Sequence, residues 1–306
     1  MVNLVGRLTF WIALAIAATL VVAGFGESQA KPFSGQIAFV ASNGNVADIF
    51  VIHADGTRLR QLTRDAREEA SPTWSPDGKS LAFIATTWQM TTDQSNAKSA
   101  ITVMAANGSK RRVLFRAQAY QLPLYDLAWS PNGPRIAFVW YRDPAFELWV
   151  LRLDGSADPV TSASVGTSSW APDGQRLAYN GRDGIFVANV RTRSARFVKG
   201  TEKSACPEWS PNGKWIAVCT SNGAGAKRIQ SIDVMTPTGA GRRQLVKGGV
   251  IFPVAWSPNS DAILFTHTKD DKGQGPRQLF IVSLRDARVT PVPGTVGVAG
   301  SASWHR

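Results

Sequence analysis

Apolar side chains recur along this chain in short runs, separated by polar segments rich in Pro, Asp, Asn and Gly. Residues 81–83 and 136–138 are apolar throughout rather than alternating, a pattern typical of strands buried on both faces. A second run follows each of them and ends before a turn, as residues 148–151 do before Asp154 and Gly155. The pattern predicts an all-β protein built from short strands and hairpins.

One motif repeats along the chain and relates these strands to one another. A Trp is followed by Ser-Pro-Asp-Gly or a close variant, which suits a hairpin turn because Pro fixes φ and Gly accepts a positive φ. The motif Trp stands at positions 74, 129, 170, 209, 256 and 304, at intervals of 39 to 55 residues. Repeats of this length are those of propeller blades.

The two ends of the repeat region complete each other. Residues 35–42 read as a second strand without a first, and residues 301–306 as a first strand without a second. We therefore expect Trp304 to pair beside Ile37 and close a six-bladed β-propeller over residues 31–306, with blade boundaries near 67, 120, 164, 202 and 249.

The Trp-Ser-Pro-Asp-Gly pattern with its following strands is similar to the TolB-type, or WD-like, propeller repeat family over residues 35–306. The resemblance implies architecture more than function. We expect no counterpart here of the α/β domain that precedes the propeller in TolB, so a role in the Tol-Pal envelope system does not follow. We likewise expect no α/β-hydrolase domain of the kind that accompanies similar propellers in prolyl-oligopeptidase-like peptidases.

Residues 1–30 have the layout of a signal peptide, with Arg7, an uncharged apolar run over 8–25 and a small-residue cleavage site at 28–30. Left uncleaved, the same run would be a membrane anchor, the chain's one expected contact with a membrane. We expect a periplasmic or secreted monomer. Its net charge of +12 then favours a protein or an anionic envelope polymer as partner, rather than nucleic acid.

Motifs for chemistry are scarce. His53, His267 and His305 lack the spacing of metal ligands, and no Gly-x-Ser-x-Gly string occurs, so we expect no metal, cofactor or catalytic centre. Cys206 and Cys219 lie equally far from the centre of one turn, which favours either a disulfide across the hairpin or two buried thiols.

Candidate ligand-binding residues follow the second strands, where the loops vary in length while the scaffold is constant. One of these loops is expected to be long and polar, from Thr86 to Ser99. Basic and acidic side chains recur there, together with one His, and the set is Arg142, Asp143, Arg182, Asp183, His267 and Asp270. Their alternative role is as solvated turn pairs. Asp126 and Glu208 precede motif Trp residues and could place carboxylates in the channel, or form salt bridges with neighbouring Arg side chains.

Fourth strands carry clusters of Arg and Lys, which either protect exposed sheet edges from aggregation or form a belt for an anionic polymer. Together these features predict an extracytoplasmic, non-catalytic binding or scaffold propeller. The alternative is a carbohydrate-active lyase or hydrolase whose site combines the six loop residues over the channel.

Overall fold

The structure is a computed structural model, and it describes residues 33–42, 46–90, 95–117, 124–142, 144–162, 165–222, 229–248, 251–268 and 276–306. The predicted signal peptide lies outside these residues. No helix in this described part is long and apolar enough to cross a bilayer.

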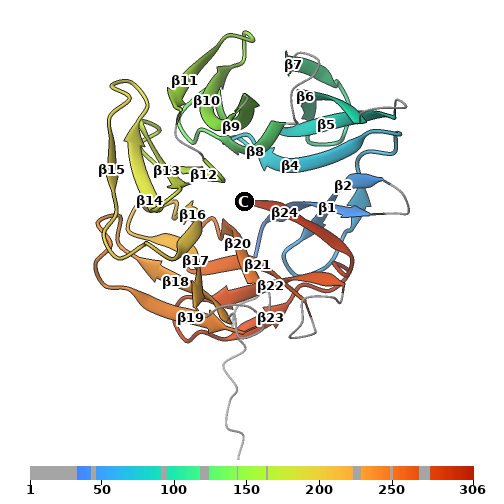
Figure 1. Ribbon diagram of the computed structural model, residues 1–306. Helices are drawn as coiled ribbons and strands as arrows, with labels where there is room; N and C mark the ends of the chain where they lie inside the picture. The colour runs from blue at the N-terminus through green and yellow to red at the C-terminus, as the bar shows by residue number, and fades with distance from the viewer. Residues whose placement is uncertain are drawn as a thin grey trace, which may run out of the picture. The chain divides into compact units, whose positions relative to one another are not determined.

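The described chain forms six antiparallel sheets of four strands each, arranged as a ring (Figure 1). Blade 1 contains β24 (Val298–His305), β1 (Gln36–Ser42), β2 (Ala47–His53) and β3 (Arg60–Gln61). Blade 2 contains β4 (Glu68–Trp74), β5 (Ser80–Met90), β6 (Ser95–Ala105) and β7 (Arg112–Arg116), and blade 3 contains β8 (Leu124–Trp129), β9 (Arg135–Arg142), β10 (Ala145–Arg152) and β11 (Ala157–Thr161).

The remaining blades repeat the same order. Blade 4 contains β12 (Ser168–Trp170), β13 (Arg176–Gly181), β14 (Gly184–Asn189) and β15 (Ala195–Phe197). Blade 5 contains β16 (Ser204–Trp209), β17 (Ile216–Asn222), β18 (Ile229–Met235) and β19 (Arg243–Lys247). Blade 6 contains β20 (Ile251–Trp256), β21 (Ala262–Thr268), β22 (Arg277–Ser283) and β23 (Val289–Pro291).

The ring closes where the sequence predicts. β24 pairs with β1, and Trp304 lies opposite Ile37. The indole Nε1 of Trp304 also donates to the Ser34 carbonyl oxygen at 3.0 Å. Ile37 and Trp304 belong to a buried cluster that joins blade 1 to blade 6, so closure combines a backbone ladder with apolar packing.

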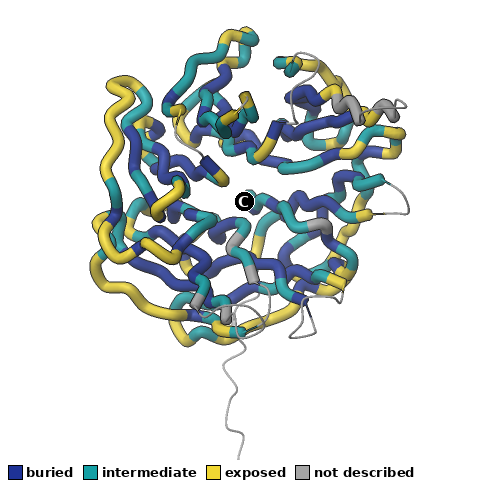
Figure 2. Tube along the Cα trace, viewed as in Figure 1, coloured by how far each residue is buried: buried dark blue, intermediate teal, exposed yellow. Residues whose placement is uncertain are grey.

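The repeated motif forms the turn between first and second strands. The Ser75 hydroxyl donates to Asp77 Oδ1 at 2.7 Å and accepts from the Ser80 backbone N–H at 2.9 Å, while Gly78 adopts φ 67°. The apolar strand that follows is buried on both faces between neighbouring blades, as expected, and Phe83 is fully buried. Exposed stretches lie mainly along the outer rim (Figure 2).

The segment from Thr86 to Ser99, which the sequence suggests is a long polar loop, is instead mostly paired. Strands β5 and β6 run on to Met90 and from Ser95, and the Thr86 and Ser99 hydroxyls share a hydrogen bond of 3.0 Å. The backbone groups of these polar residues are paired with each other across the two strands. Residues 91–94, at its tip, are outside the described residues.

First strands contain β-bulges next to the ring axis. Ser71, Asp126 and Cys206 occupy the same position, three residues before their motif Trp, and each has φ near +50°. The pairing of β4, β8 and β16 with their second strands shifts register at these points. A bulge redirects a side chain, and this one brings polar side chains to the axial cavity.

Arginines of fourth strands tie neighbouring blades together, a role that sequence reasoning missed. Arg112, Arg196 and Arg243 each donate to a backbone carbonyl oxygen of the following blade, namely Leu153 at 3.5 Å, Pro237 at 3.0 Å and Leu284 at 2.6 Å. A guanidinium group suits this task because it keeps its charge and offers several donors. Part of the basic rim is therefore interblade structure.

Arg242, counted with the same rim by its sequence position, reaches inward. Its Nε donates to Asp233 Oδ2 at 2.8 Å, and its Nη2 donates to Ser204 Oγ at 2.9 Å and to Thr220 Oγ1. The Asp233 residue is 6% exposed. Arg242 also donates to the Gly200 carbonyl oxygen, in the segment before β16. The pair fixes the outer strands of blade 5 to the start of its first strand.

Candidate functional site

An axial cavity of about 690 Å³ is the leading candidate site in the described part of the chain. First strands of all six blades line it, and the chain's last residue, Arg306, lies among the lining residues near the ring axis (Figure 1). Its polar lining includes Ser71, Asp126, Ser168, Cys206, Glu208 and Ser301. Small side chains such as Thr73, Ala128 and Ala255 precede most motif Trp residues and leave this space open.

Asp126 enters the cavity from the bulge of β8. Its Oδ2 accepts hydrogen bonds from the Ser168 backbone N–H at 2.8 Å and the Ser168 hydroxyl at 3.1 Å. Burial in the cavity wall raises the pKa of this carboxyl group to about 6, against the opposing effect of the Ser168 hydrogen bonds. The group therefore titrates near neutral pH.

Glu208 enters the same cavity from β16. Burial, and then the charge of Asp126, raise the pKa of Glu208 well above its ordinary value, and the Ser169 hydroxyl donates to it. In the described part of the chain no ion pair joins either carboxyl group to a basic side chain. The salt bridge to a neighbouring Arg, considered from the sequence, is thus not formed there.

A second cavity of about 600 Å³ opens between blades 4 and 5, and its lining includes Arg182, Glu202, Lys203, Cys206 and Cys219. The two cysteines are separate thiols in this structure. Symmetric pairing about the turn, expected from the sequence, is wrong by one residue, because the bulge sets Ala205 opposite Cys219.

The other candidate residues do not share a site in the described part of the chain. Arg142 stacks on the Trp140 and Trp149 rings, 5.2 and 5.5 Å from their centroids, and lies 3.6 Å from Glu147 Oε2. The His267 ring packs edge-on against the Phe280 ring, with the two ring centroids 5.7 Å apart.

Arg182 and Asp183 are exposed, whereas Asp143 and Asp270 are outside the described residues. No hydrogen bond or ion pair joins any two of Arg142, Arg182, Asp183 and His267. Among these four described residues, no direct polar contact of the kind expected in a lyase or hydrolase site is present.

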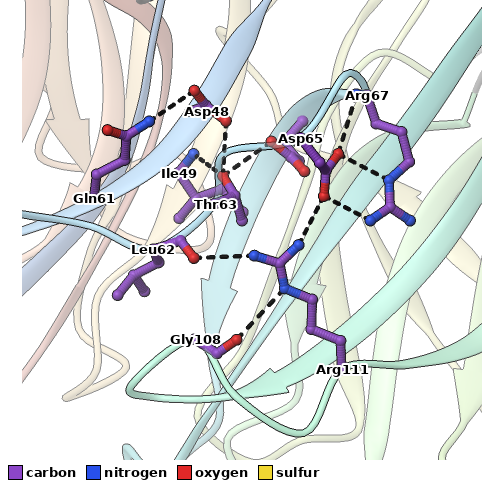
Figure 3. A network of polar contacts seen from close by, with 10 residues as sticks. Asp48, Ile49, Gln61, Leu62, Thr63, Asp65, Arg67, Gly108 and Arg111 are labelled. Carbon is purple, nitrogen blue, oxygen red and sulfur yellow. Dashed lines mark hydrogen bonds and ion pairs between the residues drawn. The ribbon is translucent and has the colours of Figure 1, made fainter.

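A buried polar network lies at the joint of blades 1 and 2, apart from both cavities (Figure 3). Thr63 Oγ1 accepts from the Ile49 backbone N–H at 2.8 Å and lies 3.2 Å from Asp48 Oδ1 and 3.0 Å from Glu69 Oε2. A hydroxyl has one proton, so it donates to only one of the two carboxyl groups. A proton on Glu69, donated to Thr63 Oγ1, satisfies all of these atoms.

The electrostatics of this network agree with that assignment. Burial raises the pKa of Glu69 to about 8, helped by the charges of Asp65 and Asp48. By contrast, a hydrogen bond from Arg67 lowers the pKa of Asp65 to about 2. Asp65 also accepts from Arg111 Nη1 at 2.8 Å. The joint thus combines an ionised carboxylate with a carboxylic acid that stays neutral.

Metal binding has no support in the described part of the chain, where no group of three or more His, Cys, Asp or Glu side chains could hold an ion. The neighbours of the Asp126 and Glu208 carboxyl groups are the Ser168 and Ser169 hydroxyls and the Cys206 thiol. The arrangement can accept a cationic or hydrogen-bond-donating group.

Comparison with known proteins supports the architecture. No protein-family model matches the chain. A TolB homolog of Chlorobium luteolum is 28% identical over 193 residues, which cover 60% of this chain and 41% of that protein. A second TolB homolog, from Chlorobium chlorochromatii, is 26% identical over 162 residues, which cover 52% of this chain and 34% of that protein. The chain thus matches less than half the length of these curated relatives.

Solved structures show the same fold. TolB from Acinetobacter baumannii superposes with a TM-score of 0.72 at 18% identity, covering 90% of this chain and 67% of that one. An oligogalacturonate lyase from Vibrio parahaemolyticus superposes with a TM-score of 0.58 at 16% identity, covering 82% and 75%. The chain is therefore a six-bladed β-propeller that is similar to the propeller of TolB proteins.

Proposed function

We propose that the chain is an extracytoplasmic binding propeller, which acts without catalysis and holds a protein partner at its axial cavity. One observation carries this proposal: Asp126 and Glu208 stand in a cavity built by all six blades, with no basic side chain of the described part paired to them. Distant similarity to TolB homologs supports a periplasmic location.

The chemistry of the cavity favours a partner segment that carries a Lys or Arg side chain. Partly buried in the cavity wall, Asp126 and Glu208 are costly to ionise, which is why the pKa of each is raised. An entering cation would compensate both charges and gain charge-assisted hydrogen bonds. Arg306 also lines the cavity, but in the described part of the chain no ion pair joins it to Asp126 or Glu208.

An anionic envelope polymer is the alternative partner, and it would use the basic outer rim. Arg112, Arg196 and Arg243 of that rim already donate to carbonyl oxygens of neighbouring blades. A guanidinium group that is held in place in this way has fewer donors left for a polymer. The cavity therefore supports the protein partner better than the rim supports the polymer.

The test uses the mature chain as bait for envelope proteins, with two matched variants. Asp126→Asn combined with Glu208→Gln removes the cavity carboxylates and keeps their shapes, while Asp286→Asn removes an exposed carboxylate at the blade 6 rim. We expect the double variant to weaken binding of the captured protein by about 30-fold, since losing a desolvated charge pair costs about 2 kcal/mol or more.

The Asp286→Asn variant should bind as the wild type does. A partner that binds the double variant with unchanged affinity does not use the cavity, and the proposal is then wrong. If the captured partner is instead a polymer whose binding is abolished by salt and unchanged in the double variant, the basic outer rim is the binding surface and the cavity is not.

A further inference from the structure

The two cysteines of blade 5 meet across its first β-bulge. Cys206 adopts φ 52° in β16, and its thiol is hydrogen bonded to the thiol of Cys219 on β17. The same bulge position holds Ser71 in blade 2 and Asp126 in blade 3. In blade 5 alone of these three does the bulge residue have a thiol partner on the adjacent strand.

The pair lies where two cavities adjoin. Cys206 lines both the axial cavity and the cavity between blades 4 and 5, and Cys219 lines the second of them. Phe252 is likewise shared by both cavities. The Cys219 residue is 7% exposed, whereas Cys206 is partly exposed. A small reagent that enters the axial cavity therefore meets the Cys206 thiol and not that of Cys219.

We propose that Cys206 and Cys219 are a redox-modification site, forming a reversible disulfide within the wall between the two cavities. Three observations carry this: the thiols are in contact, they belong to adjacent strands, and one of them is open to a cavity. The two thiols are not joined by a disulfide in the folded chain, so the bond can form after the blade has folded. The inference is independent of the proposed binding function.

The chemistry requires a disulfide oxidant such as oxidised glutathione. The Cys206 thiolate attacks one glutathione sulfur, the glutathione S–S bond breaks, and one glutathione thiol leaves. The Cys219 thiolate then attacks Cys206 in this mixed disulfide, the Cys206–Cys219 bond forms, and a second glutathione thiol leaves. Two protein thiols and one oxidised glutathione become one protein disulfide and two glutathione thiols.

The pH dependence of the first step follows from its surroundings. The hydrogen bond with Cys219, and burial, raise the pKa of the Cys206 thiol. The thiolate is the reactive form. Closure should therefore be slow at neutral pH and accelerate as the pH rises. Glu208 and Asp126 face Cys206 from the cavity and act in the same direction.

The experiment equilibrates the native protein with graded ratios of oxidised to reduced glutathione, then alkylates it in denaturant and measures its intact mass. We expect loss of both alkylation sites with no glutathione retained. The ratio of oxidised to reduced glutathione at which half of the protein carries the disulfide should be at least tenfold lower for the native protein than in urea, because the fold holds the thiols together. Equal midpoints, two alkylated cysteines or a stable glutathione adduct would overturn the proposal.

Two variants provide the controls. Cys219→Ser should stop at a glutathione adduct on Cys206, because no second thiol completes the exchange. In wild type the oxidised form should melt on the order of 5 °C above the reduced form, and the doubly substituted protein, Cys206→Ser with Cys219→Ser, should melt alike in both buffers. If the melting temperature of the double variant still differs between the oxidising and reducing buffers, the difference does not come from Cys206 and Cys219, and the proposal is overturned.

Discussion

Replacing Glu69 by Gln exchanges a carboxyl group for an amide of nearly the same shape at the joint of blades 1 and 2. The wild-type side chain is 1% exposed, and its Oε1 has no hydrogen-bond partner in the described part of the chain. The Gln amide N–H can donate to Thr63 Oγ1 just as the protonated acid does. The variant therefore preserves the hydrogen bond and removes the titration.

The magnitude follows from the pKa of Glu69, which is about 8 in the folded chain against an ordinary 4.5. Between these values the folded chain holds a proton that the unfolded chain releases. The stability that Glu69 contributes is thus complete below pH 4.5 and is lost as the pH rises toward 8. At about 1.4 kcal/mol per pH unit, the loss between pH 5 and pH 8 is roughly 4 kcal/mol.

Urea unfolding followed by tryptophan fluorescence gives the assay, for wild type and Glu69→Gln at several pH values across that window. The other titrating groups, including Asp48, Asp65 and Arg111, are common to both proteins and cancel in the difference. We expect the variant to gain roughly 4 kcal/mol relative to wild type between pH 5 and pH 8.

Glu68→Gln is the matched control, because it removes a carboxylate from the adjacent, exposed position. It reports the effect of losing one exposed carboxylate, together with the hydrogen bond that Glu68 accepts from Trp88 Nε1. If the difference between Glu69→Gln and wild type stays constant within about 1 kcal/mol over the window, Glu69 does not carry the proton and the reasoning on the network fails.

Three other changes test the fold and the cavity. Arg242→Met leaves Asp233 buried without its cation and should cost about 3 kcal/mol in urea unfolding, most of it recovered by also changing Asp233→Leu; a loss below about 1 kcal/mol argues against the pair. Trp304→Ala should lower the free energy of unfolding by about 3 to 5 kcal/mol, whereas Trp88→Ala, at a half-exposed position, should lower it by about 0.5 kcal/mol. Similar losses in the two variants would contradict the account of ring closure. Binding of an oligolysine peptide should weaken about tenfold from pH 7.5 to pH 5, because protonation of Asp126 removes its charge; calorimetry that finds no pH effect excludes the cavity as its site.

Much of this architecture is predictable because the repeat is local in sequence. Each motif Trp, its following turn and the apolar strand after it form one hairpin, whose chemistry is readable without knowing the neighbouring blades. The count of copies, and the complementary strands at residues 35–42 and 301–306, then predict the closure seen between Ile37 and Trp304. The length of the blade 2 hairpin was missed, because its polar residues pair through backbone atoms that carry no sequence signal.

The candidate site was predicted less well. Asp126 and Glu208 were placed at the channel from their spacing to a motif Trp, and both line the axial cavity. Arg142 and His267 instead pack against aromatic rings of their own blades, at different places on the ring. Side chains with the same position in different blades are related by the ring's rotation, so recurrence in sequence brings them together only next to the axis, as it does for Ser71, Asp126 and Cys206.

The sequence by itself determined the strands, their turns, the number of blades and the closing pair, since each depends on the order of apolar and turn residues within one repeat. Only the tertiary structure decided which arginines join neighbouring blades, that a bulge offsets Cys206 from Cys219, and that Glu69 shares one hydroxyl with Asp48. These features depend on distances between blades and on how far each group is removed from water, quantities that arise only when the ring is assembled.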